Sequence, residues 1–452
     1  MKVKFVTIII ITAGLLAASC GQNPIFYTIA AETAPKKPHI EGAPTNMVIF
    51  NREYPNPDYP EFSEDPVVEV PIVYVASGKL HWYAKTALGT GDLRWDPAEY
   101  RIDQPGGKII SLAATSERLY ALCMEGHGVN AVLRYVNKNN EQWTEIKSTV
   151  NDYPLLQSIS VDPELERVFL SVRKRSAAAY AIICMDDNDA FVLLKENTGE
   201  FSGVVSRNGI HYLCTKGDSV LKISGGIFTV NDADLLAGAV LDDSNKLTDA
   251  SDIEADKLNN DRDFIGIIKL NELDDPMIIA VERKGGALFE VNESSFKRMM
   301  YSGGDRTGEW IETGKYASNA LALWENYDNP DEKLLIIGLQ GGLYNTTTSS
   351  YTHGYVEFEL NPDGSFNAAA PRHDPGSLKS IIVGLDQDRY KATIGKYPIN
   401  YLFQAPVEID SNMTFFASTQ TQGLWSYRNR GSIDKPDWQW NAEERNNPNQ
   451  NP

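Results

Sequence analysis

A hairpin pattern that recurs along the chain constrains the fold more than any other feature of this sequence. Seven stretches each combine an apolar run rich in β-forming residues, a short polar or glycine-containing turn, and a second run built mostly around leucine and an aromatic residue. The plainest has Met277–Val281, then Gly285 and Gly286, then Leu288–Val291. Glycine suits such turns because a tight hairpin needs positive φ angles. The other six stretches are Ile72–Tyr83, Leu119–Val136, Val168–Ile182, Ile210–Ile223, Leu334–Tyr344 and Phe415–Tyr427.

The spacing of these hairpins predicts their arrangement. Four-stranded propeller blades repeat every ~40–50 residues, and insertions lengthen single intervals. The two longest intervals contain candidate insertions near residues 231–263 and 367–396. We therefore expect an all-β fold, a β-propeller of about seven four-stranded blades; six or eight blades and a β-sandwich are the alternatives. One position recurs in the second run of every hairpin, at intervals of 53, 46, 42, 67, 55 and 81 residues. The residues at this position are Leu80, Leu133, Ala179, Leu221, Leu288, Leu343 and Leu424.

Two of the hairpins resemble those of known bacterial propellers. Gly-Leu-Trp-Ser-Tyr at 423–427 and Gly-Gly-Leu-Tyr at 341–344 are similar to the hairpins of regulator-type and NHL-type propellers, in which Gly-Leu-Tyr recurs once per blade. The resemblance covers only the hairpins. It implies a ring-shaped scaffold that presents loops at two faces, usually for binding.

The N-terminus has the pattern of an export signal. Lys2 and Lys4 precede an apolar run, Phe5–Ala18, which is too short to cross a bilayer as a stable helix and has the length of a signal-peptide core. We therefore expect residues 1–19 to be a signal peptide.

The end of this run resembles the bacterial lipobox. Small residues precede Cys20, although Ala17 stands where the lipobox family prefers leucine. The resemblance implies that Cys20 becomes the first mature residue and carries a diacylglycerol and an N-acyl chain, such as palmitate. Acyl chains anchor a protein at roughly 0.8 kcal/mol per buried CH₂. An ordinary secretory signal cleaved near Ala18 is the alternative.

The residues after the cysteine suggest an address and a domain plan. Gly21 follows Cys20, whereas aspartate there would resemble an inner-membrane retention signal; we therefore expect a lipid-anchored protein of the cell envelope, at the outer membrane. The segment after Gly21 contains Pro, Glu and Asn residues, a composition typical of a tether. The predicted parts are a lipidated tether at 20–45, a propeller domain at 46–441 that ends in a closing strand at Trp438–Trp440, and a polar tail at 442–452.

The charge of the chain argues against nucleic acid as a partner. The formal charge is −19, and it becomes −21 when Lys2 and Lys4 leave with the signal peptide. Phosphate binding depends on clustered cations, which this surface lacks over most of its area.

The sequence assigns no catalytic, cofactor-binding or metal-binding residue. Six histidines are scattered without metal-ligand spacing, so we expect them at the surface or in turns. The acidic stretch Asp242–Asn245 has oxygen ligands suited to Ca²⁺ but no EF-hand pattern, which favours a solvated loop. The histidines are His39, His81, His127, His211, His353 and His373.

Three further cysteines, Cys123, Cys184 and Cys214, each end an apolar, strand-like run. Free cysteine is usually buried, so we expect three buried thiols. One disulfide and one free thiol is the alternative in an oxidising compartment.

Two hypotheses describe the function. The first is a membrane-anchored, non-enzymatic binding or assembly scaffold, which engages an envelope protein or a glycan through exposed aromatics on one face and predicts an apolar patch there. The second is a carbohydrate-active hydrolase or lyase, which predicts two or more carboxylates converging in the central cleft.

The anchor is tested by mass spectrometry of the mature N-terminus. We expect a peptide that begins at a lipidated Cys20, and we expect Cys20→Ser to yield unlipidated protein that separates with the aqueous fraction. A mature N-terminus without acyl mass, or one that begins before Cys20, would refute the lipobox interpretation.

Overall fold

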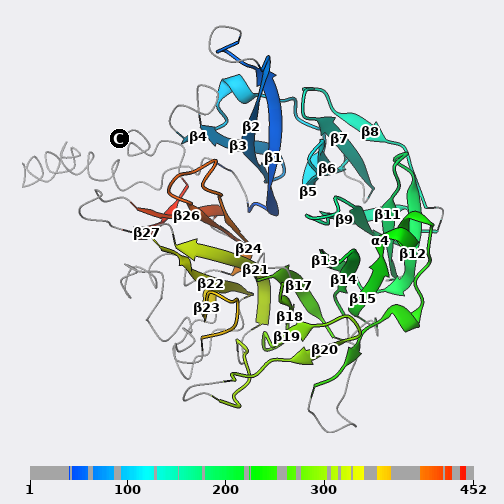
Figure 1. Ribbon diagram of the computed structural model, residues 1–452. Coiled ribbons are helices and arrows are strands. Elements are labelled where there is room, and N and C mark those ends of the chain that lie inside the picture. The colour runs from blue at the N-terminus through cyan, green and yellow to red at the C-terminus, as the bar shows by residue number, and fades with distance from the viewer. Residues whose placement is uncertain are drawn as a thin grey trace, which may run out of the picture.

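The chain folds into a ring of small antiparallel sheets around a common centre (Figure 1). The structure is a computed structural model. It describes residues 40, 43–59, 65–85, 93–126, 130–150, 152–175, 179–217, 223, 225–251, 262–270, 276–302, 307–313, 317–326, 329–340, 354–367, 398–420, 423–429 and 438–443. Within these ranges, no helix combines the length and hydropathy needed to span a bilayer.

The described residues form seven sheets, each built from strands that are consecutive in the chain. The first three sheets contain β1 (Asn46–Pro55), β2 (Val67–Ala76), β3 (Leu80–Lys85) and β4 (Leu93–Trp95); β5 (Lys108–Ala114), β6 (Arg118–Met124), β7 (Ala131–Asn137) and β8 (Thr144–Ile146); and β9 (Leu155–Val161), β10 (Val168–Arg173), β11 (Tyr180–Met185) and β12 (Phe191–Thr198).

The fourth and fifth sheets contain β13 (Phe201–Arg207), β14 (Ile210–Thr215) and β15 (Gly226–Asn231); and β16 (Thr248–Asp249), β17 (Phe264–Lys269), β18 (Ile278–Glu282), β19 (Leu288–Val291) and β20 (Ser295–Arg298). The sixth and seventh contain β21 (Ala317–Asn326), β22 (Asn329–Gln340) and β23 (Tyr355–Leu360); and β24 (Ile399–Gln404), β25 (Phe415–Thr419), β26 (Gly423–Asn429) and β27 (Trp438–Ala442). Only β16 pairs in parallel, with β20.

The innermost strand of each sheet faces the centre of the ring. Neighbouring sheets meet through these strands in the order β1, β5, β9, β13, β17, β21 and β24, and β24 contacts β1 again. The fold is therefore an all-β propeller, as the hairpin spacing predicts, and the β-sandwich alternative is wrong because the sheets form a closed ring.

Five of the seven predicted hairpins are present as the sequence pattern places them. Each joins the second and third strands of its sheet: β2–β3, β6–β7, β10–β11, β18–β19 and β25–β26. Four of them, all except β10–β11, have turn glycines with positive φ angles, as a tight hairpin requires; these are Gly78, Gly126, Gly285, Gly286 and Gly423.

The other two hairpins have a different second strand. β14 pairs with β15, which begins at Gly226, five residues after the predicted Leu221; β22 pairs with β23, which begins at Tyr355 instead of near Leu343. Burial explains the choice, because the apolar side chains of β15 and β23 fill the cores on both faces of their sheets. Leu221 and Leu343 lie outside the described residues.

The first predicted insertion is structured in part. It contains a helix, α4 (Asp232–Leu236), and a 3₁₀ helix at Asp243–Asn245. Leu235, Leu241 and Leu247 are buried against neighbouring strands. The second predicted insertion, 367–396, lies outside the described residues apart from Asn367, whose N–H donates to the Glu359 carbonyl.

Among the described strands, none is exchanged between the first and seventh sheets, where the ring closes. An apolar seam packs Tyr83 and Trp95 of the first sheet against Phe416 of the seventh, with ring centroids 5.5 and 5.9 Å from the Phe416 ring. Polar contacts reinforce it, because the Tyr401 hydroxyl donates to the Met47 carbonyl (3.0 Å) and the Ser418 hydroxyl donates to the Pro44 carbonyl (2.6 Å).

Glu443 completes this seam from a place that the sequence suggested to be polar tail. Its side chain is buried and accepts a hydrogen bond from the Trp95 indole N–H at 3.0 Å and another from the Ser426 hydroxyl. The prediction of a polar tail is wrong at this position, because both carboxyl oxygens of Glu443 accept hydrogen bonds from groups in the core.

We expect Glu443→Ala to lower the free energy of unfolding by about 1–3 kcal/mol, because a buried indole N–H loses its acceptor. Glu443→Gln keeps one acceptor oxygen and should recover part of the loss. Urea unfolding followed by tryptophan fluorescence measures both variants. Wild-type stability for the alanine variant would show that closure does not depend on this contact.

Candidate functional site

A central channel runs along the inner strands, with a volume of about 580 Å³. Its described lining is mostly aliphatic or small and comes from all seven inner strands. Glu200 and Lys216 are the charged residues of that described lining, and they form an ion pair at 3.2 Å. The enzyme hypothesis expects two or more carboxylates here, whereas the described wall carries one, already paired with a lysine.

A larger cavity, about 820 Å³, opens where inner strands end at one face of the ring. We call it the four-sheet pocket, because its lining comes from the third, fourth, fifth and sixth sheets. The residues are Pro163 and Glu164 after β9, Arg207 and Asn208 at the β13–β14 turn, Lys269, Leu270 and Pro276 around the β17–β18 connection, Leu323, Glu325 and Lys333 on β21 and β22, and Leu360, Asn361, Pro362 and Gly364 after β23.

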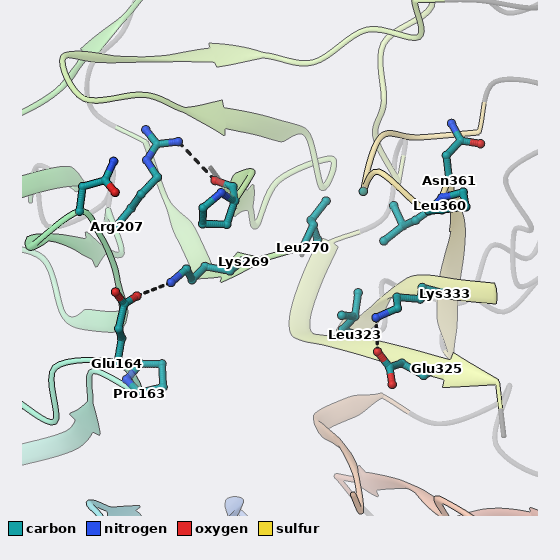
Figure 2. Close-up of a pocket in the computed structure, with 14 residues that line it drawn as sticks. Pro163, Glu164, Arg207, Lys269, Leu270, Leu323, Glu325, Lys333, Leu360 and Asn361 are labelled. Atoms are coloured by element: carbon teal, nitrogen blue, oxygen red, sulfur yellow. Dashed lines mark hydrogen bonds and ion pairs between the residues drawn. The ribbon is translucent and has the colours of Figure 1, made fainter. Parts of the chain in front are cut away.

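Charged side chains from separate sheets meet in this pocket (Figure 2). Lys269 Nζ lies 2.5 Å from Glu164 Oε2, which joins the fifth sheet to the third. Lys333 pairs with Glu325 within the sixth sheet. Figure 2 shows the two carboxylates on opposite sides of the pocket, each beside its own lysine. With Arg207, the lining has three cations and two carboxylates, a local excess of positive charge in a strongly acidic chain.

A buried turn holds Glu164 at the pocket wall. Asp162 follows β9, and its Oδ1 accepts hydrogen bonds from the backbone N–H of Glu164 (3.0 Å) and of Leu165 (3.1 Å). The Ser206 hydroxyl lies 2.8 Å from the same oxygen and 3.4 Å from Glu164 Oε2. The fourth sheet therefore positions a residue of the third.

His211 extends this contact into a buried chain of polar groups. Its Nδ1 lies 2.8 Å from Asp162 Oδ2, its Nε2 lies 3.1 Å from Asp232 Oδ1, and Asp232 accepts from Arg167 Nε at 2.8 Å. The expectation that His211 is a surface or turn residue is wrong, because it is fully buried in β14. Both ring nitrogens face carboxylates, so the imidazole links the third and fourth sheets.

These contacts set the pKa values of the two aspartates. Burial disfavours the charged form of Asp162, but hydrogen bonds from His211, Ser206 and two backbone N–H groups outweigh it and lower its pKa. The hydrogen bond from Arg167 is the main cause of the lowered pKa of Asp232.

The sequence contains one signal for this site, which is that His211 lies inside an apolar strand. Its two partners could not be predicted, because they lie 49 and 21 residues away in the chain.

His81 and the acidic stretch Asp242–Asn245 do not belong to the four-sheet pocket. His81 pairs with Asp96 at 2.9 Å, and Asp242 caps the 3₁₀ helix that follows it. Cys20, His39, His127, His353 and His373 lie outside the described residues. In the described ranges, no group of three or more His, Cys, Asp or Glu side chains is arranged so that it could hold a metal ion.

Cys123, Cys184 and Cys214 are buried free thiols, as expected. Burial raises the pKa of each thiol, to about 11 for Cys123 and about 12 for the other two. They act as small apolar side chains.

The described surface does not gather aromatics on one face, so that expectation of the binding hypothesis is wrong for these residues. The large apolar side chains that are more than a third exposed include one aromatic residue, Tyr59. The others are Ile49, Val67, Leu236, Val240, Met300 and Val407.

No family model matches the sequence, and no curated protein matches it either. Among solved structures, a protein from Lactobacillus plantarum is 8% identical, with a TM-score of 0.40 over 87% of this chain and 95% of that one. The GH74 xyloglucanase from Xanthomonas campestris is 10% identical, with a TM-score of 0.41 over 81% of this chain and 52% of that one. Sqt1 from Chaetomium thermophilum is 10% identical, with a TM-score of 0.42 over 87% and 85%. At these identities none of the three indicates a function for this chain.

The lowered pKa of Asp162 makes the free energy of unfolding depend on pH. Because its pKa is lower in the folded state than the ordinary 3.8, its contribution is present above that value and is lost as the pH falls through the folded-state pKa. We expect Asp162→Asn to lower the free energy of unfolding by about 1–3 kcal/mol at pH 7. The gap to wild type should close as the pH falls below about 4.

Chemical unfolding across this pH range measures the gap, with Asp187→Asn as the control. Asp187 pairs with Arg167, at the other end of the same chain of polar groups, but its side chain is exposed. A gap between Asp162→Asn and wild type that stays constant down to the acid limit would contradict the assignment.

Proposed function

We propose that this chain is a lipid-anchored protein of the cell envelope, held at the outer membrane through Cys20, whose propeller is a non-enzymatic binding or assembly scaffold. Its ligand is a polar envelope protein segment or glycan that occupies the four-sheet pocket. The observation that carries the proposal is the pocket itself, because residues from four separate sheets converge on one cavity of about 820 Å³.

The size and lining of the pocket suit a ligand that is polar with apolar parts. Pockets of ~300–1,000 Å³ are typical of ligand sites, with apolar walls and a few placed polar groups. Here Leu270, Leu323 and Leu360 provide apolar wall, while the lysines and asparagines provide donors. Rigid sheets hold these groups apart at fixed positions, which favours recognition.

The two lysine–glutamate pairs can exchange partners at small cost. Glu164 and Lys269 are 46% and 25% exposed, and Glu325 and Lys333 are 33% and 34% exposed. Pairs of this exposure contribute only about 0–1 kcal/mol, so an anionic or hydroxyl-rich ligand can take the place of the glutamate beside either lysine. Each carboxylate lies beside a lysine on its own side of the pocket, an arrangement suited to ion-pair recognition.

The test captures the ligand with the full chain and then measures its affinity. Wild-type protein and the variant Lys269→Gln/Lys333→Gln are incubated with cell-envelope extract, captured molecules are identified by mass spectrometry, and the identified ligand is titrated. We expect the double variant to bind at least about tenfold more weakly, because two charge-assisted hydrogen bonds are lost.

Lys138→Gln is the matched control, because Lys138 also pairs with glutamates but lies outside the pocket. Equal binding by wild type and the double variant would place the ligand elsewhere and refute the pocket as its site.

A further inference from the structure

Arg52 is a buried cation in the apolar core between the first and second sheets. It is only 2% exposed, and it lies on β1 opposite Val70 and two residues beyond Phe50, which belong to that core. Buried charges in proteins are normally paired, because an isolated one costs several kcal/mol. Arg52 should therefore have a negatively charged group close to its guanidinium.

The described protein groups around Arg52 leave most of its donors without an acceptor. Nη2 donates to the Asn140 carbonyl at 2.8 Å, and Cζ lies 5.4 Å from the centroid of the Tyr54 ring. In the described part of the chain, the buried Nε and Nη1 atoms have no hydrogen-bond acceptor of good geometry, and the buried Tyr54 hydroxyl has no partner. The buried Tyr74 hydroxyl faces Arg52, whose hydrogen bonding opposes the rise of the Tyr74 pKa. We call Arg52, Tyr54 and Tyr74 the Arg52 cluster.

The nearest carboxylates in the strand register are engaged with another cation. Glu53 follows Arg52 on β1, and Glu69 is its partner on β2. Both lie within ion-pair distance of Lys138 Nζ, at 2.9 and 3.4 Å. These carboxylates gather around Lys138, whereas Arg52 contacts the Asn140 carbonyl and the Tyr54 ring.

The two phenols cannot supply the negative charge at neutral pH. Burial raises the pKa of Tyr54 to about 12 and that of Tyr74 further, although nearby Arg52 opposes the shift in both cases. Arginine stays protonated throughout this range. The cluster therefore presents one positive charge and several N–H and O–H donors.

We propose that the Arg52 cluster binds a small monovalent inorganic anion of the chloride class. The anion lies against the Arg52 guanidinium, accepts hydrogen bonds from the cluster, and neutralises the buried charge. The guanidinium has donors only, and each phenol can turn its O–H outward as a donor, so the set suits a halide, which only accepts hydrogen bonds. The burial of the cluster favours an anion without a bulky organic part. Because Arg52 also binds the Asn140 carbonyl of the second sheet, the anion strengthens the contact between these two sheets.

The test uses the full-length protein and compares sodium chloride with sodium gluconate at constant ionic strength. Thermal unfolding should show a saturable rise in Tm of roughly 2–4 °C with chloride. Arg52→Met keeps an unbranched side chain without the charge, and it should remove the dependence on chloride while raising Tm in gluconate, because no buried cation remains.

Arg167→Met is the control, because Arg167 is paired with Asp232 and Asp187 and should leave the chloride dependence intact. A bromide-soaked crystal of the wild-type protein should show an anomalous peak beside Arg52, which tests the proposal even if Arg52→Met does not fold. Equal Tm values in chloride and gluconate, a chloride effect that persists in Arg52→Met, or no bromide peak at Arg52 would each overturn it.

Discussion

Closure of the ring is the constraint on which the rest of the structure depends. Each sheet of the described chain is built from consecutive strands, so nothing covalent or strand-paired joins the last sheet to the first. Aromatic packing of Tyr83, Trp95 and Phe416 and the buried Glu443 join these sheets. If this seam opened, the inner strands would lose their common centre, and the channel, which is lined from both the first and the seventh sheets, would lose part of its wall.

Much of the fold could be predicted from the sequence, because hairpins are local. An apolar run, a short polar or glycine-containing turn and a second run fold back on each other whatever the rest of the chain does, and five of the seven were placed correctly. The errors at Leu221 and Leu343 arose where the second strand follows a longer connection. There, burial between two sheets decides which residues pair, and that choice depends on neighbours far along the chain.

The candidate site could be predicted far less well, because its residues come from four sheets. Glu164 lies after β9, Lys269 ends β17 and Lys333 lies within β22, and each looks like an ordinary surface charge when read alone. His211 looked like a turn residue because its partners, Asp162 and Asp232, belong to a loop and a helix that only the ring brings beside it. The Lys2–Cys20 signal stays a prediction, since it lies outside the described residues.

The absence of an exchanged strand in the described sheets has a topological consequence. Every boundary between neighbouring sheets is crossed by one connecting segment and by side-chain packing, and the seam differs only in lacking the segment. A circularly permuted chain that began at β5 and ended with β1–β4 would keep every strand pairing within its own sheet. The order in which the sheets follow one another along the chain is therefore independent of the geometry of the ring.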